Sequence, residues 1–127
     1  MTDDVQKHLT RADLSLRAAE RMMPEFPSDA ISRAYYAVFH AAKAVALLLD
    51  IDRSSHHALW SVFGREVANT ELMPRECHKY ALDLFSARMS SDYLADPADT
   101  VALAERHLQN AREFVAAAKT FIEEHTR

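Results

Sequence analysis

The centre of the chain reads Ser32-Arg33-Ala34-Tyr35-Tyr36-Ala37-Val38-Phe39-His40-Ala41-Ala42-Lys43. This pattern predicts the middle of a helix that is apolar almost all round, as is typical of a helix with several neighbours. One stripe is nevertheless polar. Each helical residue turns by about 100° and rises by about 1.5 Å, so Arg33 and His40 lie about 20° from eclipsed and about 10.5 Å apart. Tyr36 lies between them, and Lys43 continues the line.

Composition indicates a single helical domain. The 127 residues are enough for one domain with its own core. The chain has only one glycine, Gly64, whereas tight hairpins and phosphate-binding loops depend on glycine. We therefore expect one all-α domain over residues 1–127, without a glycine-rich nucleotide-binding motif.

Apolar residues recur at alternating steps of four and three along the long segments, as in helices packed in a bundle. Short connections between such helices make neighbours antiparallel. The sequence thus predicts an up-and-down bundle of about five helices. They are expected from about Asp3 to Met23, from Ser28 as N-cap to about Asp50, from Ser54 or Ser55 as N-cap through Val67, from Pro74 past Arg88, and from Asp96-Pro97 through Ile122.

Charge and cysteine content narrow the classes of function. A net charge of −4 argues against a globally basic surface, so any nucleic acid would be bound at one local groove. The single cysteine, Cys77, allows no intramolecular disulfide and is expected to be buried and inert. Without a signal peptide or an apolar run of 18 residues, we expect a cytoplasmic protein that does not enter membranes.

The sequence contains no convincing motif of metal-ligating residues. His56 and His57 are adjacent, so on a helix their side chains point about 100° apart. One cysteine cannot supply the usual ligand set of a zinc site. We therefore expect neither a metal nor a cofactor. The sequence alone does not explain Gly64 inside the expected third helix, for which close packing would be one reason.

The polar stripe allows three interpretations. In a purely structural role, Arg33 pairs with a carboxylate and the stripe fixes the register of a dimer. In a binding role, it holds a nucleotide or a partner protein. In a catalytic role, His40 has a pKa near its usual value and transfers protons, while Arg33 holds a phosphate. Tyr36 and Lys43 would then position an RNA strand, whose 2′-hydroxyl is the nucleophile.

Arg88 also has two interpretations. Asp92 follows it by one helical turn, which predicts an ion pair within the helix. Alternatively, Arg88 points across the bundle towards residues 32–43 and adds a second cation to an anion site.

Three segments resemble the HEPN-domain family, especially its small stand-alone prokaryotic members. Residues 32–44 resemble the central helix of the family. Ser55-His56 followed by Phe63-Gly64 is similar to its next helix, and residues 88–93, Arg-Met-Ser-Ser-Asp-Tyr, are similar to its Arg-x-x-x-Asp-Tyr signature. The resemblance runs in order through most of residues 5–122. It implies a helical bundle that forms a homodimer.

The resemblance also implies a function. Many HEPN proteins are toxin ribonucleases with an arginine followed, after four to six residues, by a histidine, and Arg33 and His40 have six residues between them. This implies a metal-independent ribonuclease of a toxin–antitoxin or defence pair, with Arg33 and His40 as catalytic residues. Tyr36, Lys43, Arg88 and His56 would bind the RNA.

The family pattern leaves an alternative open. Other members act beside a separate nucleotidyltransferase chain, so this chain could be a non-catalytic module that binds a nucleotide or docks such a partner. In one toxin branch the motif is Arg-x4-His-x-Tyr and lies late in the domain. Here the pair lies early, and Ala42 occupies the place of that tyrosine.

Overall fold

The computed structural model describes residues 2–52, 55–93 and 99–126, except for the side chain of Tyr93. Within these ranges the regular structure is entirely helical, which confirms the expected all-α fold. The elements are α1 (Asp3–Met22), α2 (Pro27–Leu48), α3 (His56–Phe63), the π-helical turn η1 (Gly64–Ala68), α4 (Arg75–Tyr93) and α5 (Val101–His125).

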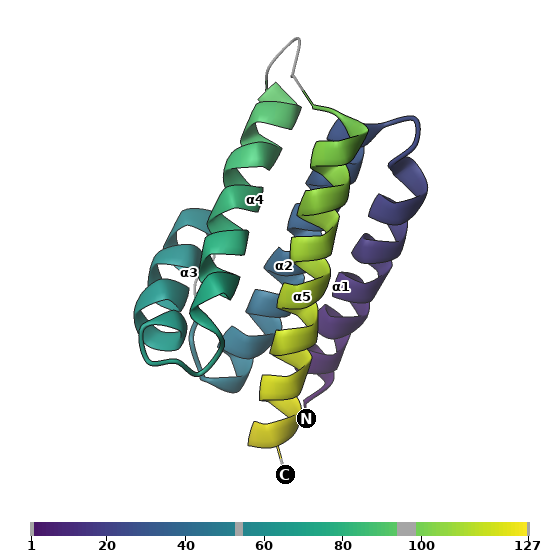
Figure 1. Cartoon of the computed structure of the whole chain (residues 1–127). Helices are drawn as coiled ribbons and strands as arrows, with labels where there is room; N and C mark the ends of the chain where they lie inside the picture. Colours follow the sequence, from purple (N-terminus) through teal and green to yellow (C-terminus); the bar gives the residue numbers. More distant parts are fainter. Residues whose placement is uncertain (1, 53–54, 94–98, 127) are drawn as a thin grey trace.

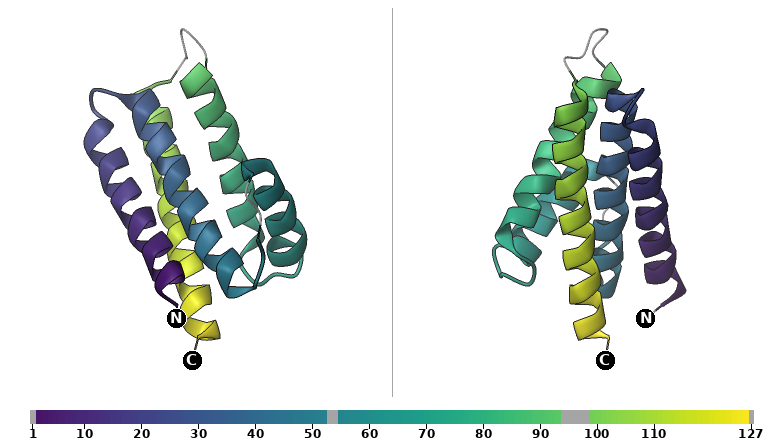
Figure 2. Two further views of the ribbon diagram at one scale, coloured as in Figure 1. Left: turned by 180° about the vertical axis from the view of Figure 1, so that it is seen from behind. Right: turned by 45° about the vertical axis from the view of Figure 1, so that its right-hand side comes forward.

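The four long helices run alternately up and down, and α3 with η1 forms a short arm between α2 and α4 (Figure 1). Both ends of the chain lie at the same end of the bundle. Helix α2 is central because it contacts α1, α4 and α5. Seen from behind, α2 lies in front, between α1 and the pair α3 and α4, with α5 behind it (Figure 2, left). One face of α2 therefore points away from the core.

The alternating apolar positions form the core, as the spacing predicts. Small residues let the backbone of α2 approach its neighbours, since seven of its alanines are buried. Large aromatic rings from α2, α3 and α5 fill the core: Tyr35 is fully buried, and Phe114 is fully buried against Trp60 and Phe63. The buried apolar positions that follow this spacing include Val5, Leu9, Ala12, Ala19, Met23, Ile31, Tyr35, Val38, Ala42, Val45, Leu59, Val62, Phe63, Val67, Cys77, Ala81, Leu84, Ala104, Leu108, Ala111, Val115, Ala118 and Ile122.

One predicted helix start is wrong. Ser28 is not the N-cap of α2, which begins at Pro27 without a side-chain cap. Its hydroxyl instead donates to Asp99 Oδ2 at 2.7 Å, and so ties the start of α2 to the segment before α5. Helix α5 begins at Val101, where the Thr100 hydroxyl accepts from a backbone N–H. The expected start at Asp96-Pro97 lies outside the described residues. Ser55, by contrast, caps α3 as predicted.

Close packing explains Gly64. A Cβ atom at this position would lie 2.6 Å from Cε1 of the His78 ring. That ring is hydrogen-bonded through Nε2 to the carbonyl of Trp60 at 3.1 Å. A glycine therefore lets α4 pack tightly against the turn that follows α3.

Candidate functional site

The predicted polar stripe lies on the outer face of α2. Arg33 is exposed, and Tyr36, His40 and Lys43 are half-buried. Side chains from three other helices approach this face. We call the resulting surface the α2 face and define it as Arg33, Tyr36, His40 and Lys43 with His8 and Arg11 of α1, His56 of α3 and Arg88 of α4.

His40 is paired with His8. The two Nδ1 atoms are 3.0 Å apart, and the ring centroids are separated by 5.2 Å. A hydrogen bond between two imidazole nitrogens needs a proton on one and a lone pair on the other. The pair can therefore carry one proton between its Nδ1 atoms but not two, and protonation of the two rings is coupled.

The pKa of His40 differs from the sequence expectation. Burial lowers it to about 4, helped by electrostatic interactions with His8, Arg11, His56 and Lys43 that disfavour its protonation. The expected value near 6.5 is therefore wrong, because sequence spacing does not reveal how far the ring is buried or which groups α1 and α3 place beside it. His40 is neutral at pH 7, so it can accept a proton but holds none to donate as an imidazolium.

The depressed pKa of His40 predicts acid sensitivity. An unfolded histidine binds a proton below about pH 6.5, whereas folded His40 does so only below about 4. Between these values the unfolded state binds more protons, so the free energy of unfolding decreases as the pH falls from 6.5 to 4. We expect His40 to account for about 1 kcal/mol of this loss, because solvent screens a half-buried group.

Urea unfolding of the wild type and His40→Gln at about pH 7 and about pH 4.5 measures this contribution. The wild type should lose more stability between the two pH values than the variant. His56 and His107, whose pKa values are also lowered, remain in both proteins and cancel in the comparison. His8 is coupled to His40, so any change in its protonation is counted with that of His40. Equal losses would contradict the assigned pKa of His40.

Arg88 makes the predicted ion pair within α4 and also points across the bundle towards α2. Its Nε atom lies 2.8 Å from Asp92 Oδ2 within α4, and its Nη2 atom donates to the Tyr36 hydroxyl at 2.8 Å. The guanidinium also lies 5.3 Å from the centroid of the Tyr36 ring, within cation–π range. Ser32 of α2 donates to the other oxygen of Asp92. These contacts hold the Tyr36 ring and the Arg88 charge rigidly at the edge of the α2 face.

Arg33 lies at one end of the α2 face. It lines a pocket of about 430 Å³ together with Tyr36, Ser32, Asp92 and other residues of α1 and α2. The charged Arg33 side chain and the Tyr36 side chain therefore line the same pocket. A chain running along α2 from Arg33 past Tyr36 reaches His40 after about 10.5 Å, the rise of seven helical residues.

His56 of α3 lies near Tyr36 and Arg88 on the α2 face. Its ring stacks on Phe39 with a centroid separation of 4.1 Å and an interplanar angle of 11°. Its Nδ1 atom is 2.5 Å from the hydroxyl oxygen of Tyr35, which accepts from Trp60 Nε1 at 3.1 Å. Burial, together with Arg88 and Lys43, lowers the pKa of His56. His56 is therefore also neutral at pH 7.

The structure brings the predicted residues to one surface, adds two residues to it that the sequence did not single out, and places a buried third, Tyr35, behind it. His8 and Arg11 come from α1, and no spacing in the sequence links them to His40. Tyr35 was expected only as a core residue, and it is indeed fully buried. Its hydroxyl nevertheless reaches His56, and a tyrosine among aliphatic core positions is the one signal that could have indicated this.

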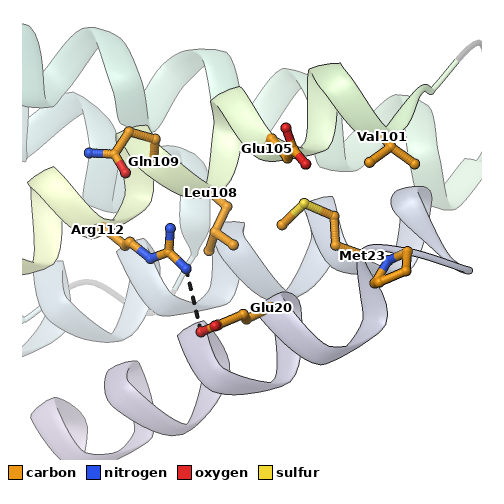
Figure 3. A pocket seen from close by; sticks show the side chains of 8 residues that line it. Glu20, Met23, Val101, Glu105, Leu108, Gln109 and Arg112 are labelled. Carbon is orange, nitrogen blue, oxygen red and sulfur yellow. Dashed lines mark ion pairs between the residues drawn. The ribbon is translucent and has the colours of Figure 1, made fainter.

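A larger pocket lies elsewhere, between α1 and α5 (Figure 3). Its volume is about 590 Å³, and its apolar side chains include Met23 and Leu108. The pair Arg112 to Glu20, at 3.4 Å, spans the two helices there. None of the predicted site residues lines this pocket, so we place the candidate site on the α2 face.

Within residues 2–52, 55–93 and 99–126, no group of three or more histidine, cysteine, aspartate or glutamate side chains could hold a metal ion. Nor do these ranges contain a helix with the length and hydropathy needed to cross a bilayer.

Comparison with known proteins identifies relatives along nearly the whole chain. The family described as HEPN domain matches residues 5–123. The UPF0332 protein glr0978 of Gloeobacter violaceus is 34% identical over 125 residues, which cover 91% of this chain and 99% of the relative. Two proteins of Methanocaldococcus jannaschii are also similar. "Putative toxin MJ0605" is 28% identical over 96% of this chain and 91% of its own length, and "Putative toxin MJ0142" is 30% identical over 71% and 62%.

Proposed function

We propose, from the fact that this chain belongs to the HEPN domain family, that it has a toxin-type role and cleaves single-stranded RNA on the α2 face. The names of the two M. jannaschii relatives support the toxin-type role. The cleavage chemistry is our inference from the geometry of the α2 face. The observation that carries it is a neutral histidine, His40, surrounded by positive charge.

These surroundings suit a general base that acts beside a phosphate. With an empty face, Arg11 and Lys43 disfavour the His40 imidazolium. A bound phosphodiester carries a negative charge that offsets these cations, so the pKa of His40 rises towards neutrality when RNA is present. A base is most effective when its pKa is near the working pH. The base would therefore reach its useful pKa only in the complex with RNA.

The reaction that fits this arrangement is intramolecular transesterification. The RNA 2′-oxygen attacks the adjacent phosphorus, and its proton passes to Nε2 of His40. The bond from phosphorus to the 5′-oxygen breaks, and the departing oxygen takes a proton from water. The products are a 2′,3′-cyclic phosphate and a free 5′-hydroxyl, and the His40 imidazolium returns its proton to solvent. Arg33 would stabilise the charge on the phosphoryl oxygens.

Cleavage of short RNA oligonucleotides in EDTA tests this function. We expect the purified protein to cut single-stranded RNA and to leave 2′,3′-cyclic phosphate ends, detected by mass spectrometry. The matched substrate carries a single 2′-deoxynucleotide on the 5′ side of the cut bond, and we expect no cleavage there because the nucleophile is missing. Absence of cleavage by a folded protein, or equal cleavage at the deoxynucleotide, would contradict the mechanism.

A toxin-type role implies a partner that restrains it. We therefore expect an antitoxin chain, for which a separately encoded nucleotidyltransferase is the candidate implied by the family resemblance. A homodimer would also suit the site, because a two-fold axis can place two α2 faces on either side of one strand.

A further inference from the structure

We propose that buried Tyr35 is a positioning residue that holds His56 in one tautomer, so that His56 presents its Nε2–H group to a phosphoryl oxygen of the bound strand. The inference deepens the proposed function and rests on it for the role of His56. The tautomer itself follows from hydrogen bonding in the folded protein and can be measured without RNA.

The direction of the hydrogen bonds determines the tautomer. Indole Nε1–H is only a donor, so at 3.1 Å the Tyr35 oxygen accepts from Trp60. The hydroxyl of Tyr35 has one proton of its own, and Tyr35 is fully buried. A buried donor needs an acceptor, and Nδ1 of His56 lies next to the Tyr35 oxygen. Tyr35 therefore donates to Nδ1, and the single proton of neutral His56 is on Nε2.

The surroundings of Tyr35 and His56 favour this arrangement. Burial raises the pKa of Tyr35 to about 12, so its hydroxyl keeps its proton throughout the physiological range. Stacking of His56 on Phe39 orients the imidazole plane. The charges of Arg88 and Lys43 act on His56 and disfavour its imidazolium form, which preserves the lone pair on Nδ1 that Tyr35 needs.

The position of His56 suits a hydrogen-bond donor to RNA. Phe39 packs against both His56 and His40. The centroid of its ring is 4.1 Å from that of the His56 ring and 5.5 Å from that of the His40 ring. A neutral imidazole is a poor acid but a good N–H donor, so His56 would stabilise charge on the phosphoryl group rather than protonate the leaving oxygen. One protomer would then supply a base, His40, and a neutral donor, His56, from two different helices.

Long-range ¹H–¹⁵N NMR spectra of the imidazole rings test the tautomer directly. In the wild type at pH 7 we expect His56 to be protonated at Nε2 and not at Nδ1. In Tyr35→Phe the donor is lost, so both tautomers should be populated and the pKa of His56 should rise. Tyr80→Phe is the control. It removes the hydroxyl of a tyrosine on a different helix, α4, and should leave the His56 spectrum unchanged. An Nδ1–H tautomer in the wild type would overturn the proposal even if Tyr35→Phe failed to fold.

RNA cleavage then tests the role of His56. We expect His56→Leu to lower kcat about 100-fold, the effect typical of losing one donor to a developing oxyanion. His56→Gln retains an N–H donor near the position of Nε2 and should recover part of this loss. Unchanged kcat in His56→Leu would overturn the role of His56. If the wild type shows the predicted tautomer but cleaves no RNA, the proposed function fails while the positioning by Tyr35 stands.

Discussion

Replacing His40 with alanine should reduce RNA cleavage by about 100- to 10,000-fold in kcat, the range typical of losing a general base. The reason is that His40 is the proposed base: burial and neighbouring charges lower its pKa to about 4, and RNA binding would raise that pKa towards neutrality. Binding of RNA should change far less, because Arg33 and Lys43 remain in place. Single-turnover cleavage and fluorescence anisotropy with the same oligonucleotide separate the two effects.

His57 provides a control for a general loss of activity. His57 is exposed and follows His56 directly, so His57→Ala removes an imidazole near the site without touching His40. We expect this variant to cleave at the wild-type rate. Circular dichroism and gel filtration should show that all proteins are folded and have the same oligomeric state. Retained cleavage in a folded His40→Ala protein would exclude His40 as the base.

The second large effect concerns the core behind the site. Phe114→Ala should lower the free energy of unfolding by about 3–5 kcal/mol, as is typical when a buried phenylalanine is truncated. Phe114 is fully buried and contacts Trp60 and Phe63 of α3. Because Trp60 donates to Tyr35, the cavity should also loosen the contacts that orient His56.

Chemical denaturation measures this loss, and Phe26→Ala is the control. Phe26 is 54% exposed at the turn between α1 and α2, so truncating it should change stability by about 0.5 kcal/mol or less. Because a domain is usually stable by only about 5–15 kcal/mol, the Phe114 variant should be studied at low temperature. A loss below about 1 kcal/mol would show that the ring is not packed as the structure describes.

Helix positions were largely predictable from the sequence, whereas some helix boundaries were not. Alternating steps of three and four apolar residues indicate which face of each helix is buried, since burial of a continuous stripe is what drives helices together. The start of α2 was missed because Ser28 has the residue type of an N-cap. Its hydroxyl bonds instead to Asp99, which is 71 residues away in the chain.

The candidate site, like the fold, was predictable from the sequence only in part. Periodicity alone places Arg33, Tyr36, His40 and Lys43 on one stripe of a helix, because residues seven apart nearly eclipse each other. It cannot tell which neighbouring helices approach that stripe.

Only the tertiary structure decided what surrounds the stripe. Packing brings His8 against His40 and lowers the pKa of His40 to about 4, and it joins Arg88 to Tyr36 and Tyr35 to His56. The physical reason is that helix formation depends on local spacing, whereas pKa values and tautomers depend on charges and hydrogen-bond partners contributed by other helices. The sequence by itself therefore determined the all-α bundle and the polar face, while contacts between helices determined the chemical state of the histidines on that face.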